Sequence, residues 1–229
     1  QLLLSCPDTN IDFNARQNRG VTPLMLACQN GHKDVVQLLL DHPDPNIELN
    51  ARTNNDQLTA FMYACLKGHK DIVELLLDHS GPNIELNAKD AFVRCTAFMI
   101  SCEKGHKDIV KLLLDHPNSN IDLNAKDRST FTAFMMACQK GHKDVVQLLL
   151  DHSDQNVDLN AQARRGMTTA FMKACQQGHK DVVQLLLGYS DRIELNAKDD
   201  NGTNALMLAC NNGHKDVVKF LLNHSDKPI

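Results

Sequence analysis

The tetrapeptide Gly-His-Lys-Asp occurs six times in this 229-residue chain, beginning at residues 31, 68, 105, 141, 178 and 213. A segment that recurs every 20 to 50 residues or so is one supersecondary unit, and its stacked copies share one elongated core. Length alone suggests one or two globular domains. The period instead predicts a single solenoid in which each copy contacts mainly its neighbours.

One copy, at residues 14–49, has the pattern of two short helices followed by a loop. Thr22 is a favourable N-cap, Pro23 suits the first helical position, and Gly31 ends the first helix in the left-handed conformation. Asp34 lies in the first turn of the second helix, where the helix dipole favours an anion. The sequence therefore predicts a helix-turn-helix in each copy.

The second helix is apolar nearly all round, which predicts that it packs between neighbouring copies. One of its positions is polar in every copy, and we expect these residues to form a solvated stripe: Gln37, Glu74, Lys111, Gln147, Gln184 and Lys219. A loop follows this helix, and residues 46–50 then alternate between polar and apolar. That alternation predicts a short extended stretch with Ile47 and Leu49 turned inward.

The copies resemble the ankyrin repeat. The family pattern Thr-Pro-Leu-His-x-Ala is matched at residues 22–27, Gly-His at 31–32, Val-x-Leu-Leu-Leu at 36–40 and Asn-Ala at 50–51. The resemblance covers essentially the whole chain, and it implies an all-α ankyrin solenoid over residues 1–229. We expect a partial repeat at 1–13, repeats at 14–49, 50–86, 87–123, 124–159 and 160–195, and a truncated last repeat at 196–229. Both ends look cut from a longer array.

The copies depart from the family pattern in a consistent way. Methionine stands where the family usually has histidine, so we expect packing to replace that histidine's hydrogen bond, at Met25, Met62, Met99, Met135, Met172 and Met207. Leu24 becomes phenylalanine in the next four copies, which enlarges the expected core. Each repeat also exceeds the family's usual length by a few residues, chiefly in the loop after the second helix.

Composition argues against two classes of partner. There are 24 Lys and Arg against 28 Asp and Glu, with a formal net charge of −4 and no basic cluster of the kind that binds a phosphate backbone. Aromatic residues, on which single-stranded nucleic acids stack, are few. No apolar run reaches the ~20 residues that span a bilayer. We therefore expect neither nucleic-acid binding nor membrane insertion in this segment.

Six of the eight cysteines recur at one place in the copies: Cys28, Cys65, Cys102, Cys138, Cys175 and Cys210. Stacked helices lie about 8–10 Å apart, whereas a disulfide needs its Cα atoms within about 7 Å. We therefore expect a ladder of free, buried thiols, which favours an intracellular, cytoplasmic location. Cys6 and Cys95 lie off the ladder, and Cys95, in a loop tip, is expected to be the more accessible of the two.

The repeated histidines and acids raise the question of metal sites. His32 and His42 are ten residues apart, about 15 Å along a helix, so they cannot share one tetrahedral zinc site. We expect each histidine to support its helix end or loop by hydrogen bonding. The alternating acids and amides of residues 44–50 are a weak calcium-loop pattern without the required glycine, and a solvated turn is the preferred interpretation.

No copy has the irregularity that a catalytic site would introduce into a repeat. We therefore predict no enzymatic activity, cofactor or metal in this segment. Any catalytic activity would have to come from a domain outside it.

The resemblance implies that protein partners bind on the concave face, through the loop tips before each first helix and that helix's exposed residues. The copies also differ most at these places, as expected where recognition is encoded. The candidate partner-binding residues are Asn18, Arg19, Asn54, Asp56, Tyr63, Leu66, Lys67, Phe92, Val93, Arg94, Glu103, Lys104, Arg128, Ser129, Lys140, Arg164, Arg165, Lys173, Gln176 and Gln177.

Two loop tips allow alternative interpretations. Phe92 and Val93 beside Arg94 fit an interface hot spot, or Phe92 folds back onto the neighbouring tip. Arg164 and Arg165 pair with carboxylates of a partner, or they are simply solvated.

The sequence thus predicts a non-catalytic scaffold that binds protein partners. Because the copies are nearly identical, it also fits a segment of a long, spring-like or filament-forming superhelix that self-associates through its exposed ends. Diversified loop tips favour recognition, whereas apolar end faces favour continuation or stacking.

Overall fold

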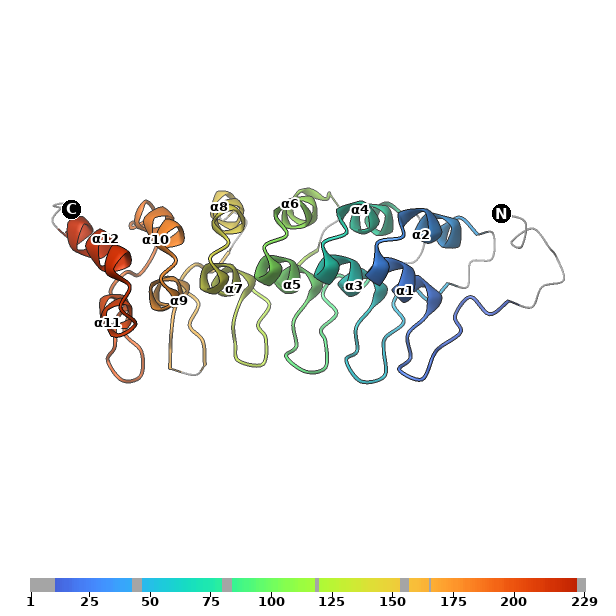
Figure 1. Cartoon of the computed structure of the whole chain (residues 1–229), viewed down its shortest axis with the longest axis horizontal. Coiled ribbons are helices and arrows are strands. Elements are labelled where there is room, and N and C mark those ends of the chain that lie inside the picture. The colour runs from blue at the N-terminus through green and yellow to red at the C-terminus, as the bar shows by residue number, and fades with distance from the viewer. Residues whose placement is uncertain are drawn as a thin grey trace.

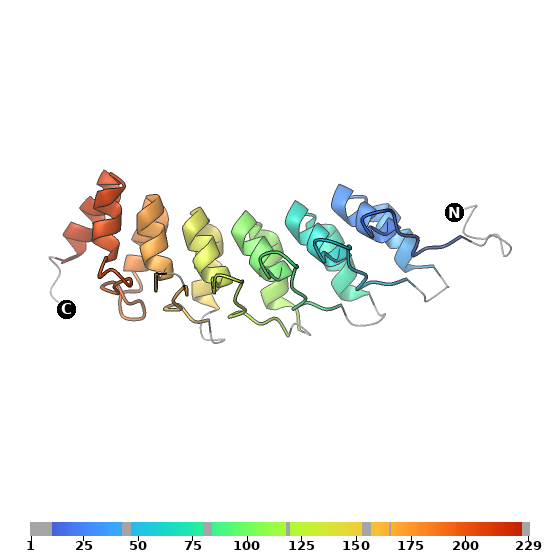
Figure 2. The same cartoon turned by 90° about the horizontal axis from the view of Figure 1, so that it is seen from below.

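The computed structural model describes residues 11–42, 47–79, 84–117, 120–152, 157–164 and 166–225. Within them the chain forms twelve α-helices and no strand, apart from one isolated bridge between Lys198 and Asn204. The helices form six consecutive pairs. These pairs lie in one row in Figure 1, and Figure 2 shows the same row from below. The predicted all-α solenoid is confirmed.

Odd- and even-numbered helices form separate layers (Figure 1). The odd-numbered helices are α1 (Pro23–Asn30), α3 (Ala60–Lys67), α5 (Ala97–Lys104), α7 (Ala133–Lys140), α9 (Ala170–Gln177) and α11 (Ala205–Asn211). The even-numbered helices are α2 (Lys33–Leu40), α4 (Lys70–Asp78), α6 (Lys107–Asp115), α8 (Lys143–Asp151), α10 (Lys180–Leu187) and α12 (Lys215–Ser225). Each odd-numbered helix packs against its even-numbered partner and against the odd-numbered helices of adjacent repeats.

Helices this short are marginal alone, and the N-termini of the odd-numbered helices are capped by side chains. The Thr22 hydroxyl accepts a hydrogen bond from the Met25 N–H at 3.3 Å, and Gly31 ends α1 in the left-handed conformation with φ 76°. The same threonine cap recurs at α3, α5, α7 and α9, and Asn204 replaces threonine at α11. The predicted caps and helix ends are confirmed.

The core is a ladder of equivalent side chains. Phe61, Phe98, Phe134 and Phe171 are each at most 2% exposed, so the larger residue at this position fills the shared core as expected. The methionines are buried from the first repeat to the fifth, which bears out packing at that position, but Met207 in α11 is 54% exposed. The predicted polar stripe of the even-numbered helices is exposed or half-buried throughout.

The expectation that the even-numbered helices pack between neighbours holds in the interior and weakens at α2. Ile72, Val73 and Leu76 of α4 are buried, whereas Val35 and Leu38 of α2 are 46% and 41% exposed. Ahead of the second repeat, Leu49 is buried and Ile47 is half-buried, as predicted. No strand forms there in the described residues.

The cysteine ladder is confirmed in five of its six places. Cys28, Cys65, Cys102, Cys138 and Cys175 are free and buried, and burial raises the pKa of the Cys28 thiol to about 12. Cys210, in the last odd-numbered helix, is exposed, contrary to expectation. None of the described helices is both long and apolar enough to cross a membrane.

The expected accessibility of Cys95 was wrong, because this residue is 4% exposed. It directly precedes the N-cap Thr96, and its backbone N–H donates to the Asp90 carboxylate at 2.6 Å. Burial raises the pKa of its thiol to about 12, and the nearby Asp90 carboxylate adds to the rise. Cys6 lies outside the described residues.

Candidate partner-binding surface

A projecting loop, which we call a finger, precedes each odd-numbered helix (Figure 1). The six fingers are residues 14–22, 50–59, 87–96, 124–132, 160–169 and 196–204. In the third finger, Asp90 is buried and its carboxylate accepts the N–H groups of Phe92 and Val93, both at 2.9 Å. An acid at the base of the finger thus fixes the conformation of its tip.

Adjacent fingers are joined through the backbone. The N–H of one tip donates to a carbonyl of the preceding tip, in the pairs Asn54 to Arg19, Ala91 to Asp56, Arg128 to Val93, Arg164 to Ser129 and Asp200 to Gly166. The shortest of these bonds, from Arg128 to Val93, is 2.7 Å. Since each bond spans two repeats, the tips form one connected row.

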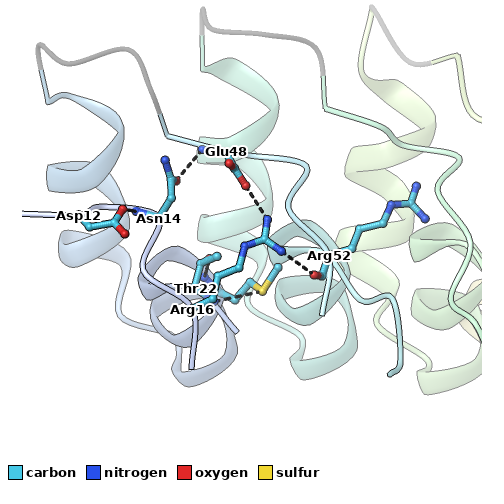
Figure 3. A network of polar contacts seen from close by, with 7 residues as sticks. Asp12, Asn14, Arg16, Thr22, Glu48 and Arg52 are labelled. Atoms are coloured by element: carbon cyan, nitrogen blue, oxygen red, sulfur yellow. Dashed lines mark hydrogen bonds and ion pairs between the residues drawn. The ribbon is translucent and has the colours of Figure 1, made fainter. Parts of the chain in front are cut away.

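A second inter-repeat ladder lies at the base of the fingers (Figure 3). The Asn14 side-chain oxygen accepts the Glu48 N–H at 2.9 Å, and Arg16 pairs with the Glu48 carboxylate at 2.6 Å. Asn50 and Arg52 repeat both contacts with Glu85 one repeat later. The ion pairs are substantially exposed and contribute at most about 1 kcal/mol each, so this ladder mainly fixes the register of the repeats.

The repeated histidines form a third ladder. The Nε2 atom of His142 lies 2.8 Å from the Glu103 carbonyl, at the end of the preceding repeat's odd-numbered helix, and His69, His106, His179 and His214 make the equivalent contact. The prediction that these histidines support a helix end is confirmed, and the helix end belongs to the repeat before. Gly-His-Lys-Asp is therefore part of the junction between repeats.

Between the third and fourth fingers lies a cavity of about 240 Å³. Its walls come from both fingers and from α5 and α7, and they consist of Val93, Cys95, Glu103, Asp127, Ser129, Phe131, Met136, Gln139 and Lys140. No other described repeat has the same amino acid at the position of Val93, Phe131 or Met136. These three residues form part of the wall beside Asp127, Gln139 and Lys140, which recur in other copies.

The family model for ankyrin repeats (3 copies) matches residues 1–90, 83–163 and 155–229. The chain belongs to the ankyrin repeat family. The crystal structure of the human ASB11 ankyrin repeat domain is similar with a TM-score of 0.76 and 22% identity, over 96% of this chain and 90% of that one, which supports the fold alone. No curated protein matches the chain. Ankyrin repeats generally serve as protein–protein interaction modules.

The ankyrin array brings several predicted residues together at this cavity. Val93, Glu103, Ser129 and Lys140 all line it. Arg94 lies elsewhere, because it lines a separate open cavity of about 680 Å³ that includes Arg52 and Lys89. The third tip therefore presents Val93 and Arg94 to different grooves, and Phe92 lines neither of them.

Exposure separates the remaining candidates. Phe92 is 60% exposed, so the alternative in which it folds back onto its neighbour was wrong. The tip residues Asn18, Arg19, Asn54, Arg128 and Arg164 and the helix-end residues Lys67, Lys104 and Gln177 are exposed, whereas Asp56, Leu66, Lys173 and Gln176 are half-buried. Arg165 lies outside the described residues.

The prediction for Tyr63 was wrong. We expected it to be exposed on α3, but it is only 9% exposed. Burial raises the pKa of its hydroxyl, the nearby Asp56 carboxylate raises it further, and Arg19 partly offsets both. The equivalent positions Ile100 and Met136 are buried too, whereas Leu26 of α1 is 41% exposed.

Sequence reasoning missed Cys95, Asp127, Phe131, Met136 and Gln139 as lining residues. The expected surface comprised tips and helix ends, whereas these side chains lie at the bases of the fingers and inside the helix layer. The available signal was Phe131, an aromatic residue directly before an N-cap threonine, where the first two repeats have Val21 and Leu58.

Charge is distributed unevenly in the described part of the chain. The fingers with their odd-numbered helices, residues 14–31, 50–68, 87–105, 124–141, 160–178 and 196–213, contain thirteen Lys and Arg against six Asp and Glu. The segments between and after them contain nine against seventeen. An array of net charge −4 thus carries a positive excess on its finger segments.

Chemistry at the surface is limited in the described residues. They contain no group of three or more His, Cys, Asp or Glu side chains placed to hold a metal ion. The buried thiols have raised pKa values and therefore remain protonated near neutral pH, so they are weak nucleophiles. What the surface offers is shape, apolar contact and charge.

Proposed function

We propose that this ankyrin array is a non-catalytic scaffold that binds protein partners on its concave face, formed by the fingers and the odd-numbered helices. The observation that carries the proposal is the third finger. Phe92 and Val93 are 60% and 51% exposed, and Val93 also forms part of the wall of the cavity between the third and fourth fingers. Exposed apolar side chains beside a preformed hollow are typical of an interaction site.

The distribution of constant and variable residues supports the same function. Glycines and histidines that join one repeat to the next recur, whereas the tips and the cavity-wall residues Val93, Phe131 and Met136 differ from copy to copy. The inter-finger hydrogen bonds hold those tips in a row, so a partner meets a surface that is largely formed before binding.

Site-specific photo-cross-linking tests the proposal. A benzophenone amino acid replaces Phe92 in one variant and, as a matched control, the exposed Lys111 of α6 in another. Both variants are irradiated in a lysate of cells that express the protein. We expect one or more proteins to cross-link at position 92 and not at position 111. Cross-linking that is equal at both positions, or confined to position 111, would contradict binding on the concave face.

A second candidate function is a segment of a filament-forming or spring-like superhelix. Exposure of apolar side chains at both ends of the described array supports it, since Val35 and Leu38 of α2 and Met207 of α11 are each more than 40% exposed. Sedimentation velocity tests self-association, which predicts concentration-dependent species that Met207→Gln reduces. A strictly monomeric chain at high concentration would contradict it.

We also propose an intracellular, cytoplasmic location. Its support is the free cysteine ladder, because buried thiols that are never paired persist most readily in a reducing compartment. Imaging of the tagged full-length protein tests this, and secretion into the medium would contradict it.

A further inference from the structure

The cavity between the third and fourth fingers has an apolar interior. Cys95 is 4% and Met136 is 7% exposed, and Phe131 is half-buried with the Lys173 ammonium 5.6 Å from the centre of its ring. A cavity of about 150 Å³ is large enough to accommodate benzene. A volume of about 240 Å³ therefore accommodates one aliphatic or aromatic side chain, but not a folded element.

The finger beside this cavity is unusual within the chain. Phe92 and Val93 occupy the two tip places where the second finger has Asn55 and Asp56. None of the other described fingers has a large apolar side chain at either place. The two most exposed apolar side chains of the described fingers are thus adjacent, ahead of Met167 in the fifth finger at 46%, and one of them, Val93, lines the cavity.

The acids around the cavity already have partners. Asp90 accepts the N–H groups of its own finger, and Asp127 accepts those of Ser129 at 2.8 Å and Phe131 at 2.7 Å. Glu103 pairs with Lys140 at 3.4 Å, with both side chains partly exposed. These carboxylates stabilise the fingers and the junction between α5 and α7, so they are poorly placed to bind a basic partner.

The cations near the cavity are more available. Lys104, Arg128 and Arg164 are exposed on α5 and on the fourth and fifth fingers, and none of them forms an ion pair within the described residues. The wider finger segments also carry an excess of Lys and Arg, whereas the segments of the even-numbered helices carry an excess of Asp and Glu. An acidic partner is therefore attracted to one side of the array and repelled by the other.

We propose that this cavity takes one apolar side chain of a partner's acidic peptide segment, whose carboxylates lie against Lys104, Arg128 and Arg164. The proposal rests on the proposed function and specifies the chemistry of the partner. A peptide fits better than a nucleic acid, which would match the cations but leave the apolar cavity and the exposed Phe92 and Val93 without a complement.

A selection experiment with random peptides tests this partner chemistry directly. A random 16-residue peptide library displayed on phage is selected against the full chain. We expect the enriched peptides to share one Leu, Ile, Met or Phe with at least two Asp or Glu within four residues of it. Enrichment of basic or uncharged peptides, or of none, would overturn the proposal.

Binding of the best peptide, made synthetically with a fluorescent label, is then measured by anisotropy. Val93→Ser should weaken binding at least tenfold, and the matched control Val35→Ser on α2 less than twofold, because the two valines are similarly exposed. Lys104→Glu should weaken binding of the acidic peptide at least fivefold, and Lys111→Glu on α6 less than twofold. For a peptide with Lys in place of its acids the order should reverse, so that Lys104→Glu binds it more tightly than Lys111→Glu does.

The outcomes separate this proposal from the proposed function. If the peptide is insensitive to Val93→Ser and Lys104→Glu while partners still cross-link at position 92, the cavity proposal fails and concave-face binding remains. If cross-linking at position 92 also fails, both are wrong. Tighter binding of a labelled oligothymidylate than of the peptide, sensitive to Lys104→Glu, would assign the surface to nucleic acid and overturn the proposal.

Discussion

Each repeat contributes one finger and one junction to the next repeat. The junctions are nearly constant in sequence along the array, whereas the fingers vary. At each interior junction a glycine with positive φ touches the next repeat's histidine, and a Cβ atom on Gly105 would lie 2.5 Å from the His142 ring. At the finger tips the backbone also adopts positive φ, at Gly20, Gly166 and Gly202 but equally at Gln57, Arg94, Thr130 and Met167, so glycine is not constant there. Contact between repeats, more than backbone strain, thus accounts for which residues recur.

Substitution of a junction glycine gives the largest expected effect. Gly105→Ala should lower the free energy of unfolding by about 3 kcal/mol, with about 1 from the left-handed backbone and about 2 from overpacking against His142. Gly213→Ala is the matched control, because its φ is 71° and nothing lies within 4 Å of the added Cβ, so it should lose only about 1 kcal/mol. Urea denaturation of both variants measures this, and equal losses would show that steric contact does not explain the constancy.

Removal of a junction histidine should have a smaller effect. His142→Ala eliminates the 2.8 Å contact with the Glu103 carbonyl and should cost about 1.5 kcal/mol, whereas His32→Ala, at an exposed histidine in the first described repeat, should cost less than about 0.5 kcal/mol. The same denaturation assay compares the two. A loss at His32 as large as that at His142 would contradict the inter-repeat role.

A change at a finger tip should have the smallest effect, and of the opposite sign. Met167 is 46% exposed with φ 45°, so Met167→Gly relieves about 1 kcal/mol of backbone strain, part of which the added freedom of the unfolded chain offsets. We expect a net gain of about 0.5 kcal/mol. Gly202→Ala, the reverse change at the equivalent place, should destabilise the array by about 1 kcal/mol. Destabilisation by Met167→Gly would mean that the tip side chains contribute to folding.

Local features of the fold were predictable because they depend on residues close in sequence. The cap at Thr22, the end of α1 at Gly31 and the start of α2 at residue 33 all follow from short-range hydrogen bonding and backbone preference. The repeat period then predicted that successive copies stack on one another in chain order.

Features that depend on how one repeat is placed on the next were not predictable. The carbonyl that His142 contacts is 39 residues away, and the burial of Tyr63 and Cys95 was not evident from their places within one repeat. A repeat length fixes which residues are equivalent, but not the shift and rotation between copies. For the same reason the tip residues Val93 and Arg94 were grouped in the sequence and line different cavities in the structure.

We infer that the variable fingers recognise the partner, whereas the constant junctions stabilise the array. The most direct test measures how tightly a finger variant binds the partner captured at position 92. The variant Phe92→Asn/Val93→Ser carries uncharged residues found at the equivalent places, Asn55 in the second finger and Ser129 in the fourth. Isothermal titration calorimetry should show a Kd at least tenfold higher than that of the unaltered chain, with an unchanged urea midpoint. A Kd within twofold of the unaltered value would contradict recognition by the fingers.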